Sequence, residues 1–462
     1  FAASAFAIHA EIPAETQAMV AKGTTQVTLG GAIRVRGMFE NNKDFNDDRA
    51  DQSAFWETAV WLRMNVKATK NTEAQITLRD AKNVSGDDDF TWGKDEGSVT
   101  GADTRGNYLN GGAPRGGVSF LEAWIQHKGS GLLGIPAGFK IGHMPLKLGD
   151  GLFYDHTKNG DDALLLFADP TKELHLGLGN AKLNEGNLAS SGSATSGNDD
   201  ADLYFFLFNY KAGKDSGISG DVALLRDQQK GIASDGMTTL VTAGKGMELR
   251  NFGLRANTKI AGLGIKADGE IQSGEAKATS TGDIKYKGYA YKVGVDYALA
   301  PVTLGLEYAY GSGDENRTDN SYKGFIGILQ NVPGSYNWMT GSRLVTPAIA
   351  TSSGTTTTVQ TGLNNIQYVK ATIGSTLAKD LTARVDFYYL KANKVGSFTY
   401  KEKDMGWEID PYIEYQIDKN LKYWVEGGYL FAGDFYKNAA NVTAGKSPDD
   451  AYSIRHGLML SF

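Results

Sequence analysis

Histidine, carboxylate and hydroxyl side chains crowd together at one place in the sequence, the segment GDGLFYDHTKNGDD at 149–162. A hydrolase needs such groups as a nucleophile with an adjacent base. His156 lies in this segment, but the spacing alone gives it no defined partner, and the other five histidines are scattered. The chain has no cysteine, which excludes a thiol nucleophile, a thiolate metal site and disulfides. We therefore expect neither an enzyme nor a cofactor.

Carboxylates gather in three other polar segments: NNKDFNDDRADQ, SGDDDF and KSPDDAY. Oxygen ligands of this kind suit divalent cations, which would also bridge such segments to lipopolysaccharide. None of the three has the ligand spacing of an EF-hand. We expect solvated surface charge and no dedicated metal site.

The composition favours many strands and few helices. Glycine accounts for 58 of 462 residues, well above the usual ~7%, and proline for only 10. Mean hydropathy is −0.33. No stretch approaches the ~18 uninterrupted apolar residues of a membrane-spanning helix, so helical membrane proteins are excluded. A net charge of −6 makes a nucleic-acid partner unexpected.

Apolar and polar residues alternate in segments along the whole chain, which is the signal of β-strands with two different faces. In 289–299, Tyr289, Val293 and Tyr297 fall on one face and Asp296 on the other. The two tyrosines are eight residues apart, which is about 20 Å of height on a tilted strand, near the ~25 Å apolar band of outer-membrane barrels. The chain also ends in an alternating segment that stops at Phe462, as such barrels do.

The connections support a barrel over a soluble sandwich, which would also alternate. Eight short turns, for example at 169–172 and 417–420, alternate with nine long polar segments. This rhythm predicts an all-β, transmembrane antiparallel β-barrel of about 18 strands (16 to 18), with short periplasmic turns and long extracellular loops. The barrel is expected to occupy 24–462. The long segments 84–116 and 312–363 could fold into the lumen or out of it, and 312–363 is long enough to fold inward or to cap the mouth.

The charged residues of the strands fall on the face opposite the apolar one and are predicted to line the pore. Basic residues gather on strands 1–3 and 18, and acidic ones on strands 11–13, which face them across an eighteen-strand ring. The two walls would set up a transverse electric field, or their charges would pair with one another in a solvated interior. The sequence leaves both alternatives open. The predicted pore-lining residues are Arg34, Arg36, Arg63, Lys67, Arg79, Glu122, Arg255, Asp268, Glu270, Asp296, Glu307, Arg384, Asp386, Glu408, Asp410 and Arg455.

Residues 1–23 are expected to lie outside the barrel. FAASAFAIHAEIPAE is similar to the end of a secretory signal peptide, with small residues and A-x-A-like cleavage options. The next residues, 12–23, have Pro13 at a possible first helical position and Gly23 as a stop. We expect a signal-peptide remnant or an N-terminal periplasmic extension, with a short helix or a plug-like extension in this second part.

Three longer motifs resemble the alginate-export family of bacterial outer-membrane barrels: GFKIGHMPLKLGDG at 138–151, YAYGSGDEN at 308–316 and the segment 406–436. The resemblance implies eighteen strands and solute passage through the lumen. The chain departs from the family at His143, where relatives tend to carry arginine after the glycine. Such barrels include nonspecific porins, so the resemblance does not fix alginate as the solute.

Together these features predict a porin of the Gram-negative outer membrane, a water-filled channel through which small hydrophilic solutes and ions diffuse without a cofactor. The alternatives are a selective export channel for an acidic polysaccharide and a structural or partner-docking barrel. The expected partners are outer-membrane lipid and lipopolysaccharide, and porin analogy suggests a homotrimer.

Overall fold

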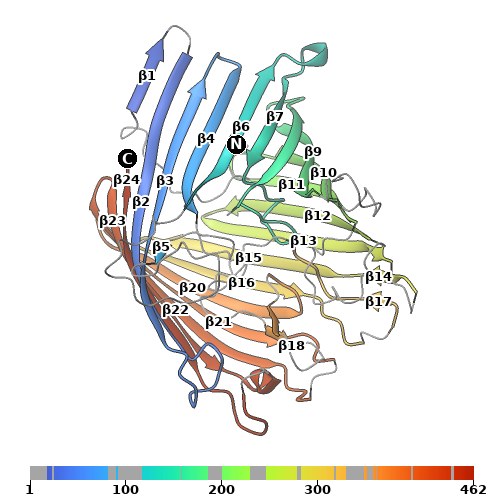
Figure 1. The fold of residues 1–462 in the computed structure, drawn as a ribbon, viewed down its shortest axis with the longest axis vertical. Coiled ribbons are helices and arrows are strands. Elements are labelled where there is room, and N and C mark those ends of the chain that lie inside the picture. The colour runs from blue at the N-terminus through green and yellow to red at the C-terminus, as the bar shows by residue number, and fades with distance from the viewer. Residues whose placement is uncertain are drawn as a thin grey trace, which may run out of the picture.

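The computed structural model describes residues 18–22, 25–81, 90–91, 117–157, 159–185, 200–228, 246–277, 282–316, 319–328, 348–350, 357–359, 362–396, 399–438 and 442–462. Its main feature is one closed antiparallel sheet (Figure 1). Within the described residues, eighteen strands form the ring. In order around it, they are β2 (Thr25–Asn41), β3 (Ser53–Lys67), β4 (Thr72–Ala81), β6 (Gly117–Gly129), β7 (Ala137–Met144), β8 (Asp161–Ala168), β9 (Leu174–Asn184), β10 (Ala201–Lys211), β11 (Gly217–Asp227), β12 (Met247–Ile260), β13 (Leu263–Ala276), β15 (Tyr289–Leu299), β16 (Val302–Gly311), β20 (Ile366–Ala378), β21 (Leu381–Ala392), β22 (Asp404–Asp418), β23 (Leu421–Ala432) and β24 (Ala451–Ser461).

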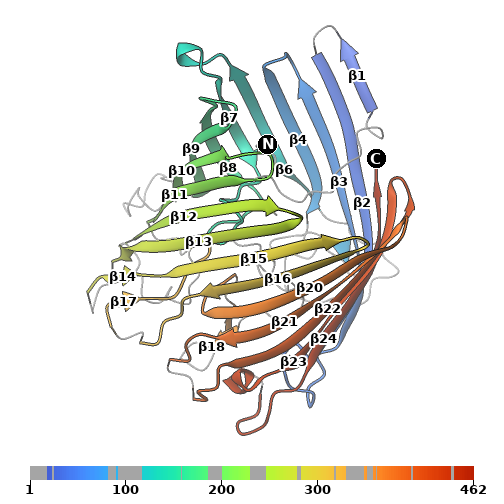
Figure 2. The same cartoon turned by 180° about the vertical axis from the view of Figure 1, so that it is seen from behind.

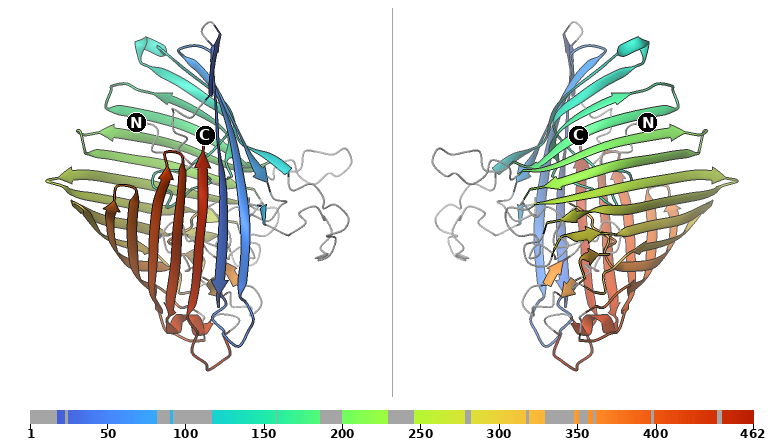
Figure 3. Two further views of the ribbon diagram at one scale, coloured as in Figure 1. Left: turned by 90° about the vertical axis from the view of Figure 1, so that its left-hand side faces the viewer. Right: turned by 90° about the vertical axis from the view of Figure 1, so that its right-hand side faces the viewer.

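The last strand closes the ring on the first. β24 pairs with β2 from Ala32↔Ser461 to Asn41↔Tyr452, and Figure 3 shows the two strands side by side. Neighbouring strands elsewhere in the ring follow one another along the chain, as the side-by-side run of β12 to β16 in Figure 2 illustrates. The predicted barrel, its eighteen strands and its alternation of short turns with long loops are confirmed.

Shorter strands and helices lie in the connections between the strands of the ring. β5 (Phe90–Thr91) pairs with β3, and β14 (Ile284–Tyr286) pairs with both β13 and β17 (Ser321–Tyr322). β18 (Ala348–Ala350) and β19 (Thr357–Val359) form a separate two-stranded sheet. Two short 3₁₀ helices, η3 (Leu132–Gly134) and η4 (Asp434–Asn438), lie in a turn and a loop. None of the described helices has the length and apolar character that a membrane span requires.

The prediction of a helix within 12–23 is wrong for the residues of this segment that the structure describes. Residues 18–22 form strand β1 (Ala18–Lys22), which pairs antiparallel with Thr25–Leu29 of β2, and the rest of the expected helix lies outside the described residues. The physical reason is an open sheet edge. β24 reaches only to Ala32, so the first residues of β2 would otherwise expose unpaired backbone groups on that side.

The outer face of the barrel is apolar. Tyr289, Val293 and Tyr297 on β15 are 41–44% exposed, which confirms that this face points away from the enclosed side. Aromatic side chains stack across strands near the long-loop ends, for example Tyr289 on Tyr310 with ring centroids 5.7 Å apart. An exposed apolar band with aromatic residues at its margin is the surface that hydrocarbon covers in an outer-membrane barrel.

The main hydrophobic core lies inside the barrel. Along β8 to β12 the inner face is also apolar near the long-loop ends, with Leu203, Leu225 and Leu249 each fully buried. These side chains belong to one cluster with Leu148 and Phe153, which lie in the connection between β7 and β8. On this arc, therefore, both faces of the sheet are apolar: the outer face is exposed and the inner face packs against a loop.

Candidate functional site in the lumen

The connection between β7 and β8, residues 145–160, folds back as a hairpin that we call the luminal hairpin. The Leu148 amide donates to the Tyr154 carbonyl (3.0 Å), and the His156 amide donates to the Leu146 carbonyl (2.9 Å). At its tip Gly149 has a φ of +52°, a conformation that glycine adopts without strain. Since its apolar residues pack on the inner wall, the hairpin occupies the enclosed side of the barrel.

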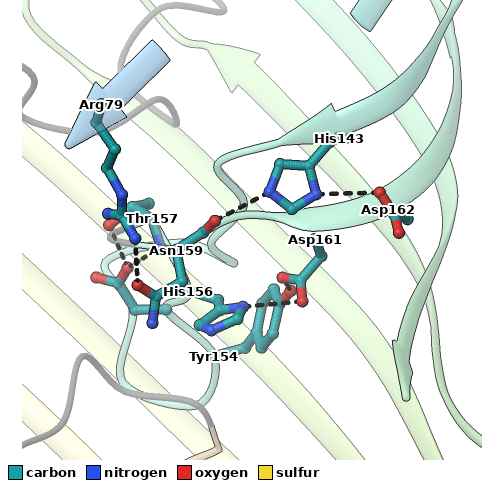
Figure 4. A network of polar contacts seen from close by, with 9 residues as sticks. Arg79, His143, Tyr154, His156, Thr157, Asn159, Asp161 and Asp162 are labelled. Atoms are coloured by element: carbon teal, nitrogen blue, oxygen red, sulfur yellow. Dashed lines mark hydrogen bonds and ion pairs between the residues drawn. The ribbon is translucent and has the colours of Figure 1, made fainter. Parts of the chain in front are cut away.

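The base of the luminal hairpin is fixed to the wall from which it starts (Figure 4). Arg79 on β4 donates to the side-chain oxygen of Asn159 (3.1 Å). Asp161, the first residue of β8, accepts from the Tyr154 hydroxyl and bonds the His156 ring at 2.8 Å. The predicted crowding of His, Asp and hydroxyl groups is therefore real, and these contacts hold the hairpin in position.

The tip of the luminal hairpin reaches a distant part of the ring. Gly149 lies against the guanidinium of Arg255 on β12, because an added Cβ there would meet that group first. Asp150 lies 3.9 Å from the ammonium of Lys292 on β15. The base contacts β4, the third strand of the ring, while the tip contacts the tenth and twelfth, so the hairpin crosses the lumen.

A second loop supports the hairpin. In the connection from β16 to β20, the Ile328 amide donates to the Phe153 carbonyl (2.7 Å). Gln272 on the inner face of β13 holds the same loop through both its amide atoms, at 2.7 Å to the Ile326 carbonyl and 2.9 Å from the Ile326 amide. The sequence left open whether 312–363 folds into the lumen, and in the structure Ile326 and Ile328 of this segment contact the inner wall and the hairpin. Of the segment 84–116, the structure describes residues 90–91, and 84–89 and 92–116 lie outside the described residues.

All sixteen charged residues singled out from the sequence lie on the inner face of their strands, opposite the exposed apolar residues. Arg255 is the centre of the largest group, with ion pairs to Asp221, Asp268 and Glu270. Other ion pairs among or beside the predicted residues include Arg36–Glu57 (2.6 Å), Arg455–Glu40 (3.1 Å), Arg63–Glu122 (4.0 Å), Lys370–Glu307 (3.2 Å) and Arg384–Asp386 (3.1 Å).

Other predicted residues make different contacts. Arg34 lies over the ring of Trp61, with 5.3 Å between the guanidinium carbon and the centroid. Glu408 and Asp410 are buried on β22. In the part of the chain that the structure describes, the side chains of Lys67 and Asp296 have no ion-pair partner. Extensive pairing supports a neutralised interior, and a net transverse field stays a prediction.

On the long-loop side two of the acidic segments meet. The Asp47 amide donates to the Asp449 carboxylate (3.1 Å), and Lys446 pairs with Asp48 (2.6 Å). Repulsion by Asp449 raises the pKa of Asp47, whereas Lys446 lowers the pKa of Asp48. No group of three or more His, Asp or Glu among the described residues is arranged to hold a metal ion. The third segment, SGDDDF, lies outside the described residues except for Phe90.

Sequence reasoning missed the role of the 145–160 connection, which it treated as one more long loop. A signal was present: LFY at 152–154 places three large apolar residues inside a polar segment. Such residues need a buried surface to pack against. The matching signal is the run of apolar residues on both faces of 163–167 and 203–208.

The model of a protein family described as "Alginate export" matches residues 25–449. Solved structures with the same fold include OccAB1 of Acinetobacter baumannii (TM-score 0.57, 12% identity, covering 94% of this chain and 96% of that chain). The outer membrane protein OprD from Pseudomonas aeruginosa matches with a TM-score of 0.51 and 13% identity, covering 94% of this chain and 93% of that chain. No curated protein matches the sequence. At these identities the solved structures establish the barrel fold.

Proposed function

The chain belongs to the alginate export family, and from this premise we propose that it forms a water-filled channel in the Gram-negative outer membrane. Small hydrophilic solutes and ions would cross it by passive diffusion. The observation that carries the proposal is the closed ring of eighteen strands with charged side chains inside and exposed apolar ones outside. The charged residues of the inner face would line the path.

The ring is wide enough for such a path. Eighteen strands spaced ~4.8 Å apart and tilted by ~40° enclose a cylinder about 36 Å across between backbones. Barrels of 16–18 strands keep an aqueous channel even after side chains are added. The luminal hairpin runs from β4 to β12 and β15 and packs on the β8–β12 arc, so it narrows this path.

Selective export of an acidic polysaccharide is the second candidate, and the family description favours it. A conduit for a polyanion needs rows of available cations. Here Arg36, Arg255 and Arg455 are already engaged by carboxylates of the wall. This pairing supports small polar solutes over a polyanion.

Conductance across planar bilayers tests the proposal with the purified protein. The channel predicts stable ohmic steps and swelling of vesicles in neutral sugars, with little block by an acidic oligosaccharide. Strong block at micromolar concentrations would favour the exporter, and no conductance at all would favour a structural or docking barrel. Neutralising Arg34 tests the transverse field, because Arg34→Gln should then shift the reversal potential while Lys214→Gln, on a periplasmic turn, should not.

The proposal extends to the membrane context. The exposed aromatic pairs on β15 and β16 would contact lipid or, in the predicted homotrimer, a neighbouring copy. The acidic loops around Asp47 and Asp449 would meet lipopolysaccharide through divalent ions. Native mass spectrometry from detergent distinguishes a monomer from a trimer.

A further inference from the structure

One side chain at the base of the luminal hairpin faces two hydrogen-bond acceptors at once. His143 lies at the long-loop end of β7, on the outer face with Ile141. Its Nδ1 is 3.0 Å from a carboxylate oxygen of Asp162, and its Nε2 is 3.0 Å from the backbone carbonyl of Asn159. Figure 4 shows the ring between these two groups.

This geometry is satisfied in full only by the charged ring. A neutral imidazole has one N–H and one lone pair, so it donates to one of the two acceptors and turns a lone pair towards the other. The imidazolium has two N–H groups and donates to both. Gain or loss of one proton on His143 therefore decides whether both contacts are made.

The carbonyl that His143 holds belongs to the hairpin itself. Asn159 is the residue whose side chain accepts from Arg79, so the two contacts fix this residue from the outer and the inner side of the wall. Gly160 lies directly against the His143 ring, since an added Cβ would be 2.7 Å from Nε2. Loss of the Asn159 carbonyl contact would leave Asn159 with the Arg79 contact alone of these two.

The charged neighbours leave Asp162 available to His143. Asp162 faces Lys182 of β9 across the sheet, but the Lys182 ammonium is engaged by Asp200, Asp202 and Glu185. On the other side, the residue of β6 opposite His143 is Ala123, which does not titrate.

The second histidine of the hairpin makes a contrast. His156 Nδ1 bonds Asp161 at 2.8 Å, and among the described residues its Nε2 has no acceptor. A neutral ring with its hydrogen on Nδ1 satisfies this contact, so His156 does not need a charge to stay in place.

We propose that His143 is a proton-operated clamp on the luminal hairpin. The protonated ring joins the outer carboxylate of Asp162 to the hairpin carbonyl of Asn159, whereas the neutral ring donates to only one of the two, so that the hairpin base loosens. The effect of the clamp on solute passage rests on the channel function proposed above. The movement of the hairpin does not, because it is measured independently of transport.

The test uses the absence of cysteine. A single cysteine at the hairpin tip, Asp150→Cys, carries a spin label in the full-length protein in lipid vesicles. The label should be immobile at about pH 5.5 and clearly more mobile at about pH 8, across the range in which histidine titrates. In the His143→Gln background the label should be mobile at both pH values, whereas in His143→Arg, which stays charged, the pH dependence should disappear.

The matched control is His156→Gln, which must keep the pH dependence. A wild-type label with the same mobility at both pH values overturns the clamp, as does a pH response that survives His143→Gln or vanishes in His156→Gln. Current noise in bilayers should follow the label, rising with pH only when His143 is present. A protein without conductance whose label still responds to pH through His143 would refute the channel and leave the clamp standing.

Discussion

Removal of Arg255 tests whether the charged group at the hairpin tip holds the structure together. The Arg255 side chain is only 8% exposed, and the carboxylates of Asp221, Asp268 and Glu270 around it are at most 2% exposed. Arg255→Met keeps most of the side-chain volume but leaves three buried acids without their counter-charge.

The expected loss is large because buried charges are costly without a partner. Breaking a buried ion pair by removing one member costs about 3–5 kcal/mol. That range corresponds to a change of about two to nearly four orders of magnitude in the unfolding equilibrium. The control is Arg384→Met. Arg384 is 45% exposed, and in the described part of the chain its ion pair is with Asp386, so its removal should lower the free energy of unfolding by about 0–1 kcal/mol.

Guanidinium unfolding in lipid vesicles, followed by tryptophan fluorescence, measures both variants. The free energy of unfolding should fall much further for Arg255→Met than for Arg384→Met. Equal losses in the two variants, or no loss for Arg255→Met, would refute the reasoning that this cluster is a buried, mutually dependent group. A second readout is the hairpin tip: a label at position 150 should become more mobile in Arg255→Met, because Gly149 packs on the guanidinium.

Two further variants probe the packing and the outer loops. Leu203→Ala removes a fully buried side chain of the inner wall and should lower the free energy of unfolding by about 2–5 kcal/mol. Leu178 is 55% exposed on the outer face, so Leu178→Ala should lower it clearly less. Equal losses in the two variants would contradict a core inside the barrel. Asp449 raises the pKa of Asp47, so ionisation of Asp47 opposes folding and the folded state gains stability as pH falls through that raised pKa. Asp47→Asn should therefore raise the melting temperature more at about pH 7 than at about pH 4, and an equal effect at the two pH values would contradict the repulsion.

The alternation of residues was sufficient to predict the barrel. In strands such as β15, which has lipid on one side and the lumen on the other, successive side chains point to opposite faces. Whether a residue has an odd or an even position in the strand, its parity, therefore decides which side it faces. Parity also placed all sixteen charged residues on the inner face. Turn and loop lengths then fixed the number of strands, because a short turn joins neighbouring antiparallel strands.

The sequence could not predict which loop enters the lumen, or the partner of each charge. Both depend on residues far apart in the chain, such as Gly149 against Arg255 and Asn159 beside Arg79 and His143. Similarly, β1 replaced the expected helix because the start of β2 extends beyond β24 and offers an open edge.

Local pattern therefore determined the ring, its inner and outer faces and the number of its strands, because each of these follows from contacts between adjacent strands. Only the tertiary structure decided how the enclosed space is divided. Closing the ring brought a hairpin between the fifth and sixth strands against the tenth and twelfth. Ion pairs and packing across the enclosed space depend on which strands face each other there, and the local alternation of residues does not predict this.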